Sequence, residues 1–321
     1  MKNNTLIILC VIFISLISFY IYIRSLNGGK ACFSNFKIQD KDVFALTRKQ
    51  RFDFYVQKGN FLSKKYPLYF NYFGVNDPSI TQSKTEDFLL AARLSLIAYD
   101  VNVNNVIAGC KELGLTYIGG SQNGDCYIYV AKMNNTTVIM IQGTEFIPGD
   151  RNIWQVWDDL SVLPHYLPSV IPGKLSDMYV HYGLYRSLLL VWPNVSNLVD
   201  YNNPVWIIGH SLGAARSMLC RYFIPISTQV RITNFGGLKS ANTAFWNHVS
   251  PNTVIERVLF EQDFAGDWQP LLPYVQPTEY FYWLTNGTIQ YVNQRNWLNI
   301  SFADHSIVNS YIPALENLVN G

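Results

Sequence analysis

The segment VWIIGHSLGAARSMLCRYF, residues 205–223, places a serine between two glycines where an apolar run changes into helix-forming sequence. Ser211 lies between Gly209 and Gly213, which is the Gly-x-Ser-x-Gly spacing of a nucleophile elbow. Glycine neighbours let the backbone make this strained turn without side-chain clashes. The apolar run before the motif is typical of a buried parallel strand, and the residues after it favour a helix. The segment therefore predicts a strand, a sharp turn and a helix, with the serine at the end of a sheet.

The motif is short enough to arise by chance, so its interpretation depends on the elements around it. The chain has 321 residues, 49% of them hydrophobic, which is enough for one large core. Strand-like and helix-like segments alternate from residue 85 onward, which predicts an α/β fold with a mostly parallel sheet and helices on both faces. We expect strands at 125–133, 137–146, 205–208, 229–237 and 254–263, and helices at 85–100, 152–163, 183–200 and 306–319.

An uncharged apolar run, Leu6–Ile23, lies near the N-terminus. A bilayer-spanning helix needs about 17 to 25 such residues. The run ends in bulky residues and Arg24 rather than in a small-x-small cleavage site, which favours an uncleaved single-pass anchor over a secretory signal. We therefore divide the chain into an anchor segment 1–24, an N-terminal extension 25–84 and an α/β domain 85–321.

The side of the membrane that the domain faces stays open. Basic residues after the span favour a cytosolic domain by the positive-inside rule. A lumenal domain is favoured instead by the glycosylation sequons at Asn134, Asn135, Asn194, Asn286 and Asn299. Two disulfides and reduced thiols are equally compatible with the cysteines outside the span, Cys32, Cys110, Cys126 and Cys220.

The charge pattern argues against several other classes of protein. The formal net charge is +2 and the charges are scattered, whereas a nucleic-acid-binding protein usually shows a basic stripe. The sequence has no Cys-x-x-Cys pair and no histidine-rich cluster, so we expect neither a metal nor a cofactor. It gives no indication of an oligomeric state.

A nucleophilic serine needs a base that takes its proton and an acid that orients the base. In elbow-type hydrolases these residues follow the order serine, acid, histidine. Three of the five histidines precede Ser211, and no acidic residue separates Ser211 from His248. His305 is therefore the candidate base.

Several acidic residues compete for the third role: Asp263, Asp267 and Asp304, with Glu256 and Glu261 behind them. Asp263 directly follows a strand-like run, and α/β sites are built at the carboxyl ends of strands. Asp304 adjoins His305, and neighbouring side chains seldom align for the imidazole hydrogen bond. We favour Asp263, with Asp267 as the alternative.

The oxyanion of acyl transfer needs preorganised donors. The backbone N–H after the nucleophile, that of Leu212, is one candidate. Thr144, which follows Gly143 at the end of a predicted strand, is the other.

Further motifs occur in a recognisable order. GHSLGAA forms the elbow, VIMIQGTEF precedes it, and VHYGLYRSL, ITNFGGLKSANTAF, RVLFEQDFAGDWQPLLP and DHSIVNSYI complete the set. Together they resemble the class 3 lipases, the group that includes the triacylglycerol lipases of filamentous fungi. The chain departs from that pattern with Gln142 where arginine is usual, with Leu238 where proline is usual and with a displaced tyrosine after His305.

The resemblance covers about residues 85–318 and implies an α/β-hydrolase fold, carboxylic-ester substrates and no metal in catalysis. It places the triad on Ser211, Asp263 and His305, and the oxyanion donors on Thr144 and Leu212. The family often covers its site with an amphipathic lid. NIWQVWDD, with Trp154 and Trp157, lies at the matching place, although both tryptophans are equally compatible with core packing.

These observations lead to one hypothesis and two alternatives. The hypothesis is a membrane-anchored serine hydrolase that forms an acyl-enzyme on Ser211 and acts on acylglycerols or phospholipids. One alternative is an esterase or acyltransferase of the same fold that acts on small soluble esters. The other is a catalytically inactive binding protein with a lipase-like fold.

Overall fold

The computed structural model describes residues 81–124, 126–143, 164–168, 177–263, 265, 274–277, 280–292 and 303–321. The predictions for the anchor segment, Thr144, Trp154, Trp157 and Asp267 lie outside these residues, as do those for Cys32 and Asn299. Within the described ranges, no helix combines the length and the apolar character that crossing a bilayer requires. The same ranges contain no group of histidine, cysteine and acidic side chains suited to a metal ion.

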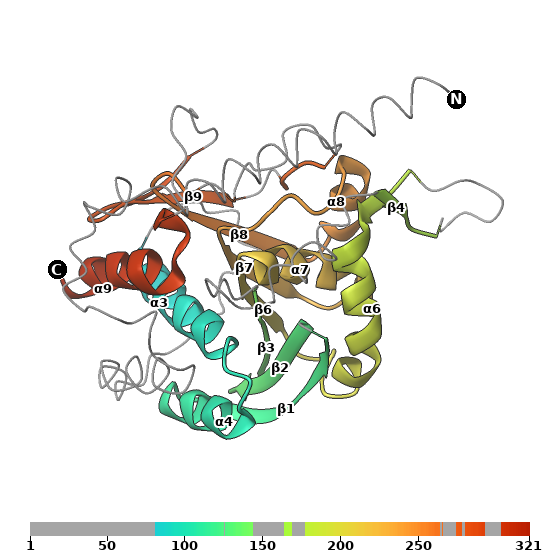
Figure 1. Cartoon of the computed structure of the whole chain (residues 1–321), viewed down its shortest axis with the longest axis horizontal. Helices are drawn as coiled ribbons and strands as arrows, with labels where there is room; N and C mark the ends of the chain where they lie inside the picture. The colour runs from blue at the N-terminus through green and yellow to red at the C-terminus, as the bar shows by residue number, and fades with distance from the viewer. Residues whose placement is uncertain are drawn as a thin grey trace, which may run out of the picture. The chain divides into compact units, whose positions relative to one another are not determined.

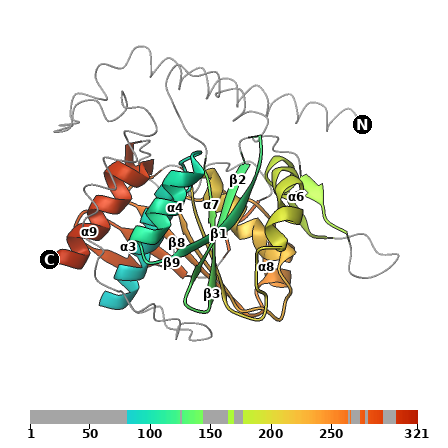
Figure 2. The same cartoon turned by 90° about the horizontal axis from the view of Figure 1, so that it is seen from below.

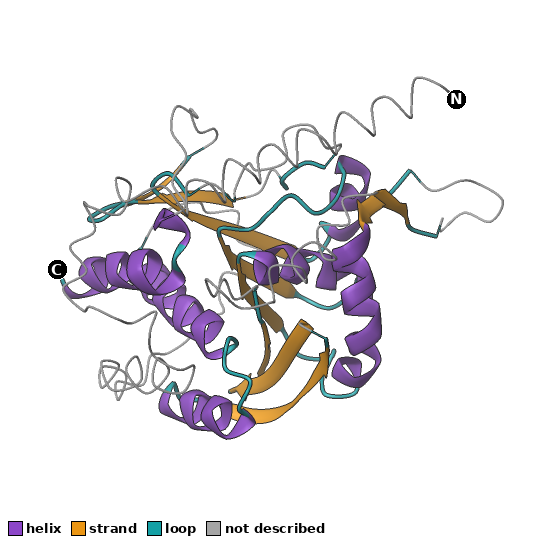
Figure 3. Ribbon diagram, viewed as in Figure 1, coloured by secondary structure: helices purple, strands orange, loops and turns teal. Residues whose placement is uncertain are grey.

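An eight-stranded sheet lies at the centre of the described domain (Figure 1, Figure 3). Its inner strands β3, β6, β7, β8 and β9 pair in parallel, and β1, β2 and β10 add antiparallel pairs at the two edges. The predicted mostly parallel sheet is therefore confirmed. In spatial order the strands are β1 (Thr116–Asn123), β2 (Cys126–Met133), β3 (Thr136–Ile141), β6 (Val205–His210), β7 (Val230–Phe235), β8 (Thr253–Phe260), β9 (Tyr280–Leu284) and β10 (Ile289–Tyr291).

Helices cover both faces of this sheet, as the turned view shows (Figure 2). One face carries α3 (Gln82–Ile97), α4 (Val103–Glu112) and α9 (Ile312–Asn320). The other face carries α6 (Tyr182–Ser196), α7 (Leu212–Cys220) and α8 (Thr243–Val249). A separate two-stranded sheet pairs β4 (Pro164–Tyr166) with β5 (Tyr179–His181).

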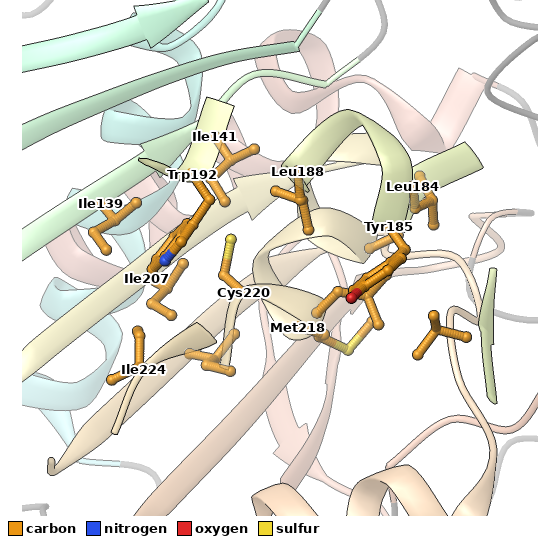
Figure 4. Close-up of a cluster of buried hydrophobic side chains, with 14 of the residues drawn as sticks. Ile139, Ile141, Leu184, Tyr185, Leu188, Trp192, Ile207, Met218, Cys220 and Ile224 are labelled. Atoms are coloured by element: carbon orange, nitrogen blue, oxygen red, sulfur yellow. The ribbon is translucent and has the colours of Figure 1, made fainter. Parts of the chain in front are cut away.

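Strand alternation divides the apolar side chains between two cores. On β6, Val205 and Ile207 enter the core under α6, α7 and α8, while Trp206 and Ile208 enter the core under α3, α4 and α9. Figure 4 shows part of the first core, in which Ile207 lies among side chains of α6 and α7. Because β6 is buried on both faces, its continuous apolar run is explained by its place in the sheet.

Some elements differ from the sequence-based expectation. α3 begins at Gln82 rather than at residue 85, because the Thr81 side chain caps it by accepting a hydrogen bond from Lys84 N. α4, β1, β9 and β10 are not among the predicted elements. The three described cysteines, Cys110, Cys126 and Cys220, are all buried.

A buried group of charges ties α3 to the sheet. The Arg231 guanidinium lies 2.6 Å from Asp87 Oδ2 and 2.8 Å from Glu256 Oε2. Lys84 Nζ lies 3.8 Å from the other Glu256 oxygen and donates to the Tyr282 hydroxyl at 2.6 Å. Opposite charges and hydrogen bonds thus compensate for the removal of these groups from water.

The substitution Glu256→Gln is expected to lower the free energy of unfolding by about 3–5 kcal/mol, because it leaves Arg231 buried with less compensating charge. The matched control is Glu316→Gln, which breaks the more exposed pair with Arg93 and is expected to cost less than about 1 kcal/mol. Urea denaturation of the three chains measures both losses. Equal losses in the two variants would contradict the importance of the buried group.

Candidate active site

Ser211 occupies a strained turn between β6 and α7. Its backbone angles are φ 59° and ψ −126°, a conformation that non-glycine residues rarely adopt. The turn is held from the neighbouring strand, because Ser211 N–H donates to the Phe235 carbonyl at 2.9 Å. The predicted strand, turn and helix are therefore present, with the serine between the last residue of β6 and the first residue of α7.

The two glycines of the motif are required by close packing. A Cβ atom on Gly209 would collide with the Gly213 carbonyl group and lie 2.7 Å from Ala214 N. A Cβ atom on Gly213 would collide with the Ile141 carbonyl oxygen at the end of β3. The first turn of α7 thus packs directly on the backbone of two strands, which leaves no space for a side chain at either position.

The structure brings Ser211, His305 and Asp263 together from distant parts of the sequence. His305 Nε2 lies 2.7 Å from Ser211 Oγ, and His305 Nδ1 lies 2.9 and 3.0 Å from the two Asp263 oxygens. A carboxylate only accepts hydrogen bonds, so Nδ1 carries the proton and donates to Asp263. Nε2 then presents a lone pair to the Ser211 hydroxyl, which is the geometry a general base requires.

Asp263 is fully buried but surrounded by donors. Besides His305, the Ala265 N–H donates to Asp263 Oδ1 at 2.8 Å and the Tyr311 hydroxyl donates to Oδ2 at 2.5 Å. Burial alone would raise the pKa of this carboxyl. The charge of His305 and the hydrogen bonds outweigh burial, so the pKa of Asp263 lies below its ordinary value. The carboxylate therefore stays ionised beside His305.

The competing acids take other positions where the structure describes them. Asp304 accepts a hydrogen bond from Gln262 N at 3.0 Å, and Glu261 accepts one from Asn286 N at 3.4 Å. Glu256 belongs to the buried group of charges on α3, β7 and β8. Asp263 is thus the described carboxylate that is hydrogen-bonded to His305.

The expected oxyanion donors are described in part. Leu212 is the first residue of α7, and the first N–H groups of a helix have no partner within it. Such groups stabilise a negative charge at a helix N-terminus. Thr144 lies beyond the described range, but Gly143 before it is buried, and a Cβ there would collide with the Tyr99 hydroxyl and the His210 carbonyl oxygen. The end of β3 therefore lies against the site.

Three residues near the triad were not assigned a role from the sequence. Tyr311 is the last residue of a π-helical turn, Ile307–Tyr311, which brings its hydroxyl to Asp263. The displaced tyrosine in DHSIVNSYI is the signal that points to it. Tyr99 and His210 lie hydrogen-bonded to each other beside His305. His210 is excluded as the base by its place before the serine, and nothing in the sequence indicates its contact with His305.

Comparison with known proteins gives a family-model match over part of the chain and a set of solved structures with the same fold. A family model described as Lipase (class 3) matches residues 138–271, which confirms the resemblance seen in the sequence. A search of curated proteins finds no match.

Solved lipase structures share the fold at low sequence identity. A triacylglyceride lipase from Rhizomucor miehei is 20% identical, with a TM-score of 0.56, and the alignment covers 75% of this chain and 98% of that one. Lipase II from Rhizopus niveus is 19% identical, with a TM-score of 0.53 and coverage of 72% and 94%. A triacylglycerol lipase described as having a serine-protease triad is 21% identical, with a TM-score of 0.55 and coverage of 70% and 94%.

The lowered pKa of Asp263 predicts a component of acid lability. An unfolded aspartate has a pKa of about 3.9, so a carboxyl with a lower folded pKa stabilises the fold above about pH 4 and loses this effect as pH falls through its folded pKa. We expect Asp263→Asn to lack this component. Its free energy of unfolding should fall less than that of the parent between about pH 6 and about pH 3 in urea denaturation. An equal fall in both chains would contradict the assignment.

Proposed function

We propose that this chain is a serine hydrolase of the class 3 lipase family that cleaves carboxylic esters of lipids, because residues 138–271 match a class 3 lipase family model and Ser211, His305 and Asp263 form one hydrogen-bonded triad. The observation that carries the proposal is the 2.7 Å contact between His305 Nε2 and Ser211 Oγ, made by a ring whose Nδ1 donates to Asp263. This arrangement activates a hydroxyl for attack on a carbonyl carbon.

The reaction follows from the roles of these atoms. Ser211 Oγ attacks the ester carbonyl while His305 Nε2 takes the hydroxyl proton, and Asp263 stabilises the resulting imidazolium. The tetrahedral intermediate carries its charge on the former carbonyl oxygen, beside the N-terminus of α7 at Leu212. His305 then gives its proton to the leaving alcohol, which leaves an acyl group on Ser211. Water, deprotonated by His305, releases the carboxylic acid and restores the serine.

We further propose that residues 6–23 anchor the chain to a membrane, with the α/β domain attached on one side. The uncharged character of that run and its bulky end support the proposal. An anchor suits an enzyme whose ester substrate is itself in a bilayer. The sequon residues Asn134, Asn135, Asn194 and Asn286 are exposed, which glycosylation on a lumenal side would require.

Removal of the nucleophile tests the reaction. Ser211→Ala is expected to lose labelling by a fluorophosphonate probe and to lower kcat for nitrophenyl ester hydrolysis by about 10⁴- to 10⁶-fold. The matched control is Ser217→Ala, one turn and a half further along α7, where the buried hydroxyl donates to the Ala214 carbonyl. The control should keep its label. A folded parent chain that takes no label and cleaves no ester would identify an inactive, lipase-like binding protein.

Acyl-chain dependence tests the class of substrate. We expect kcat/KM to rise from short to long acyl chains on nitrophenyl esters, because a lipid-ester site gains binding energy from each buried methylene group. Dispersed acylglycerol or phospholipid should also be hydrolysed. Activity limited to short, soluble esters would favour the esterase or acyltransferase interpretation.

Membrane extraction tests the anchor. The full chain is expected to stay with the membrane pellet after alkaline carbonate treatment, because a spanning helix is held by burial of its apolar residues. A chain that lacks residues 1–24 should move to the supernatant. Recovery of the full chain in the supernatant would contradict the anchor. A product shortened at its N-terminus and found in the medium would favour a cleaved signal instead.

A further inference from the structure

A second imidazole lies directly behind the catalytic one. His210, the last residue of β6, is buried, and its ring centroid lies 4.7 Å from that of His305. Its Nε2 lies 2.7 Å from the His305 carbonyl oxygen, and its Nδ1 lies 2.8 Å from the Tyr99 hydroxyl. The triad does not use either nitrogen, so this ring has a role outside proton transfer with Ser211.

The partners of His210 determine where its proton sits. A backbone carbonyl only accepts hydrogen bonds, so Nε2 carries the proton and donates to the His305 carbonyl. Nδ1 of the neutral ring is then an acceptor, and the Tyr99 hydroxyl donates to it. Burial, together with the charge of His305, lowers the pKa of His210 to about 3. The ring therefore stays neutral in the pH range where a serine hydrolase works.

Tyr99 is itself fixed to two elements. Its N–H donates to the Leu96 carbonyl at the end of α3, and its own carbonyl accepts a hydrogen bond from Gln142 Nε2 at 3.3 Å. Gln142 directly follows β3. The Tyr99 hydroxyl also occupies the space that a side chain at Gly143 would need. Tyr99, whose hydroxyl contacts His210, is thus held by the residues that follow β3 and precede Thr144, the predicted oxyanion residue.

His305 lies in a segment with little structure of its own. It ends a short 3₁₀ turn, Ala303–His305, and a π-helical turn begins at Ile307. Its ring is held by Ser211 and Asp263, but both contacts act at the reacting imidazole. The hydrogen bond from His210 acts instead on the main chain of His305. His210 itself is fixed, because it ends a strand in the middle of the sheet.

We propose that Tyr99 and His210 form a positioning pair that holds the main chain of His305 and so places its imidazole between Ser211 and Asp263. The proposal rests on the proposed function. His210 is a positioning residue because it acts through His305 and touches no reacting atom. Its neutral ring supplies the hydrogen bond without adding a second positive charge beside the imidazolium that forms on His305.

Steady-state kinetics of the full chain on a nitrophenyl ester test the pair. His210→Leu removes the donor and is expected to lower kcat by about 10- to 100-fold, because a small misplacement of a catalytic group costs about this much. KM should stay within about threefold, since the substitution acts on the position of His305 and not on binding of the ester. His210→Gln should recover most of the lost kcat, because its side-chain amide is neutral and donates a hydrogen bond toward the His305 carbonyl.

Two further variants separate positioning from stability. Ile208→Ala removes a buried side chain from the same face of β6, and it should lower the melting temperature while keeping kcat. Tyr99→Phe should lower kcat in the parent chain but have no further effect in His210→Leu, because Tyr99 acts through the His210 ring.

Distinct results would overturn the pair and the proposed function. The positioning role of Tyr99 and His210 is contradicted if kcat is unchanged in His210→Leu or if His210→Gln recovers none of the loss. It is also contradicted if Ile208→Ala loses as much kcat as His210→Leu does. Should His210→Leu fail to fold, an unchanged kcat in Tyr99→Phe overturns it equally. A folded parent chain with no ester hydrolysis would instead overturn the proposed function.

Discussion

The backbone turn at Ser211 is the constraint on which the rest of the site depends. A non-glycine residue with φ 59° costs roughly 1–3 kcal/mol, and it persists where the surroundings determine it. Here β6 is paired on both sides by β3 and β7, and α7 packs onto the backbone of β3 through Gly213. The sheet thus supplies the stability that holds the serine hydroxyl outward, at the ends of the strands where His305 and Asp263 arrive.

Asp263 shows how a buried charge is kept at this position. The carboxylate lies out of contact with water, which opposes ionisation, but it accepts hydrogen bonds from His305, Tyr311 and the Ala265 N–H. The donors come from the loop after β8, from the turn at His305 and from the π-helical turn after it. Packing of the C-terminal elements on the sheet therefore determines the electrostatics of the triad, and the order of serine, acid and histidine follows from the order of the strands.

Sequence reasoning predicted the parts of this site that have a local signal. Gly209 and Gly213 mark the elbow, and the chain order of the three roles selects His305. Asp263 was favoured because it follows a strand, and the structure places its carboxylate on His305. The parallel strands β3, β6, β7 and β8 were also predicted, because buried strands read as apolar runs, whereas β9 was not.

The other parts of the site and the edge of the sheet have no local sequence pattern that would predict them. Tyr99 and His210 are 111 positions apart, so their hydrogen bond exists only through the fold. Tyr311 reaches Asp263 because it ends a π-helical turn, and the spacing of apolar residues in the sequence does not predict such a turn. β1, with the sequence TYIGGSQN, carries two glycines and lies mostly exposed at the sheet edge, so it lacks the apolar run of an inner strand. Its pairing with β2 makes it a strand.

The reaction depends on the His305 Nδ1 proton, which lies in a hydrogen bond to a buried Asp263 carboxylate. Proton NMR in water measures this directly, because a proton in such a bond is deshielded and protected from exchange with solvent. We expect a low-field imidazole resonance in the parent chain that is absent in both His305→Ala and Asp263→Asn. A parent spectrum without this resonance, or a resonance that persists in Asp263→Asn, would contradict the account.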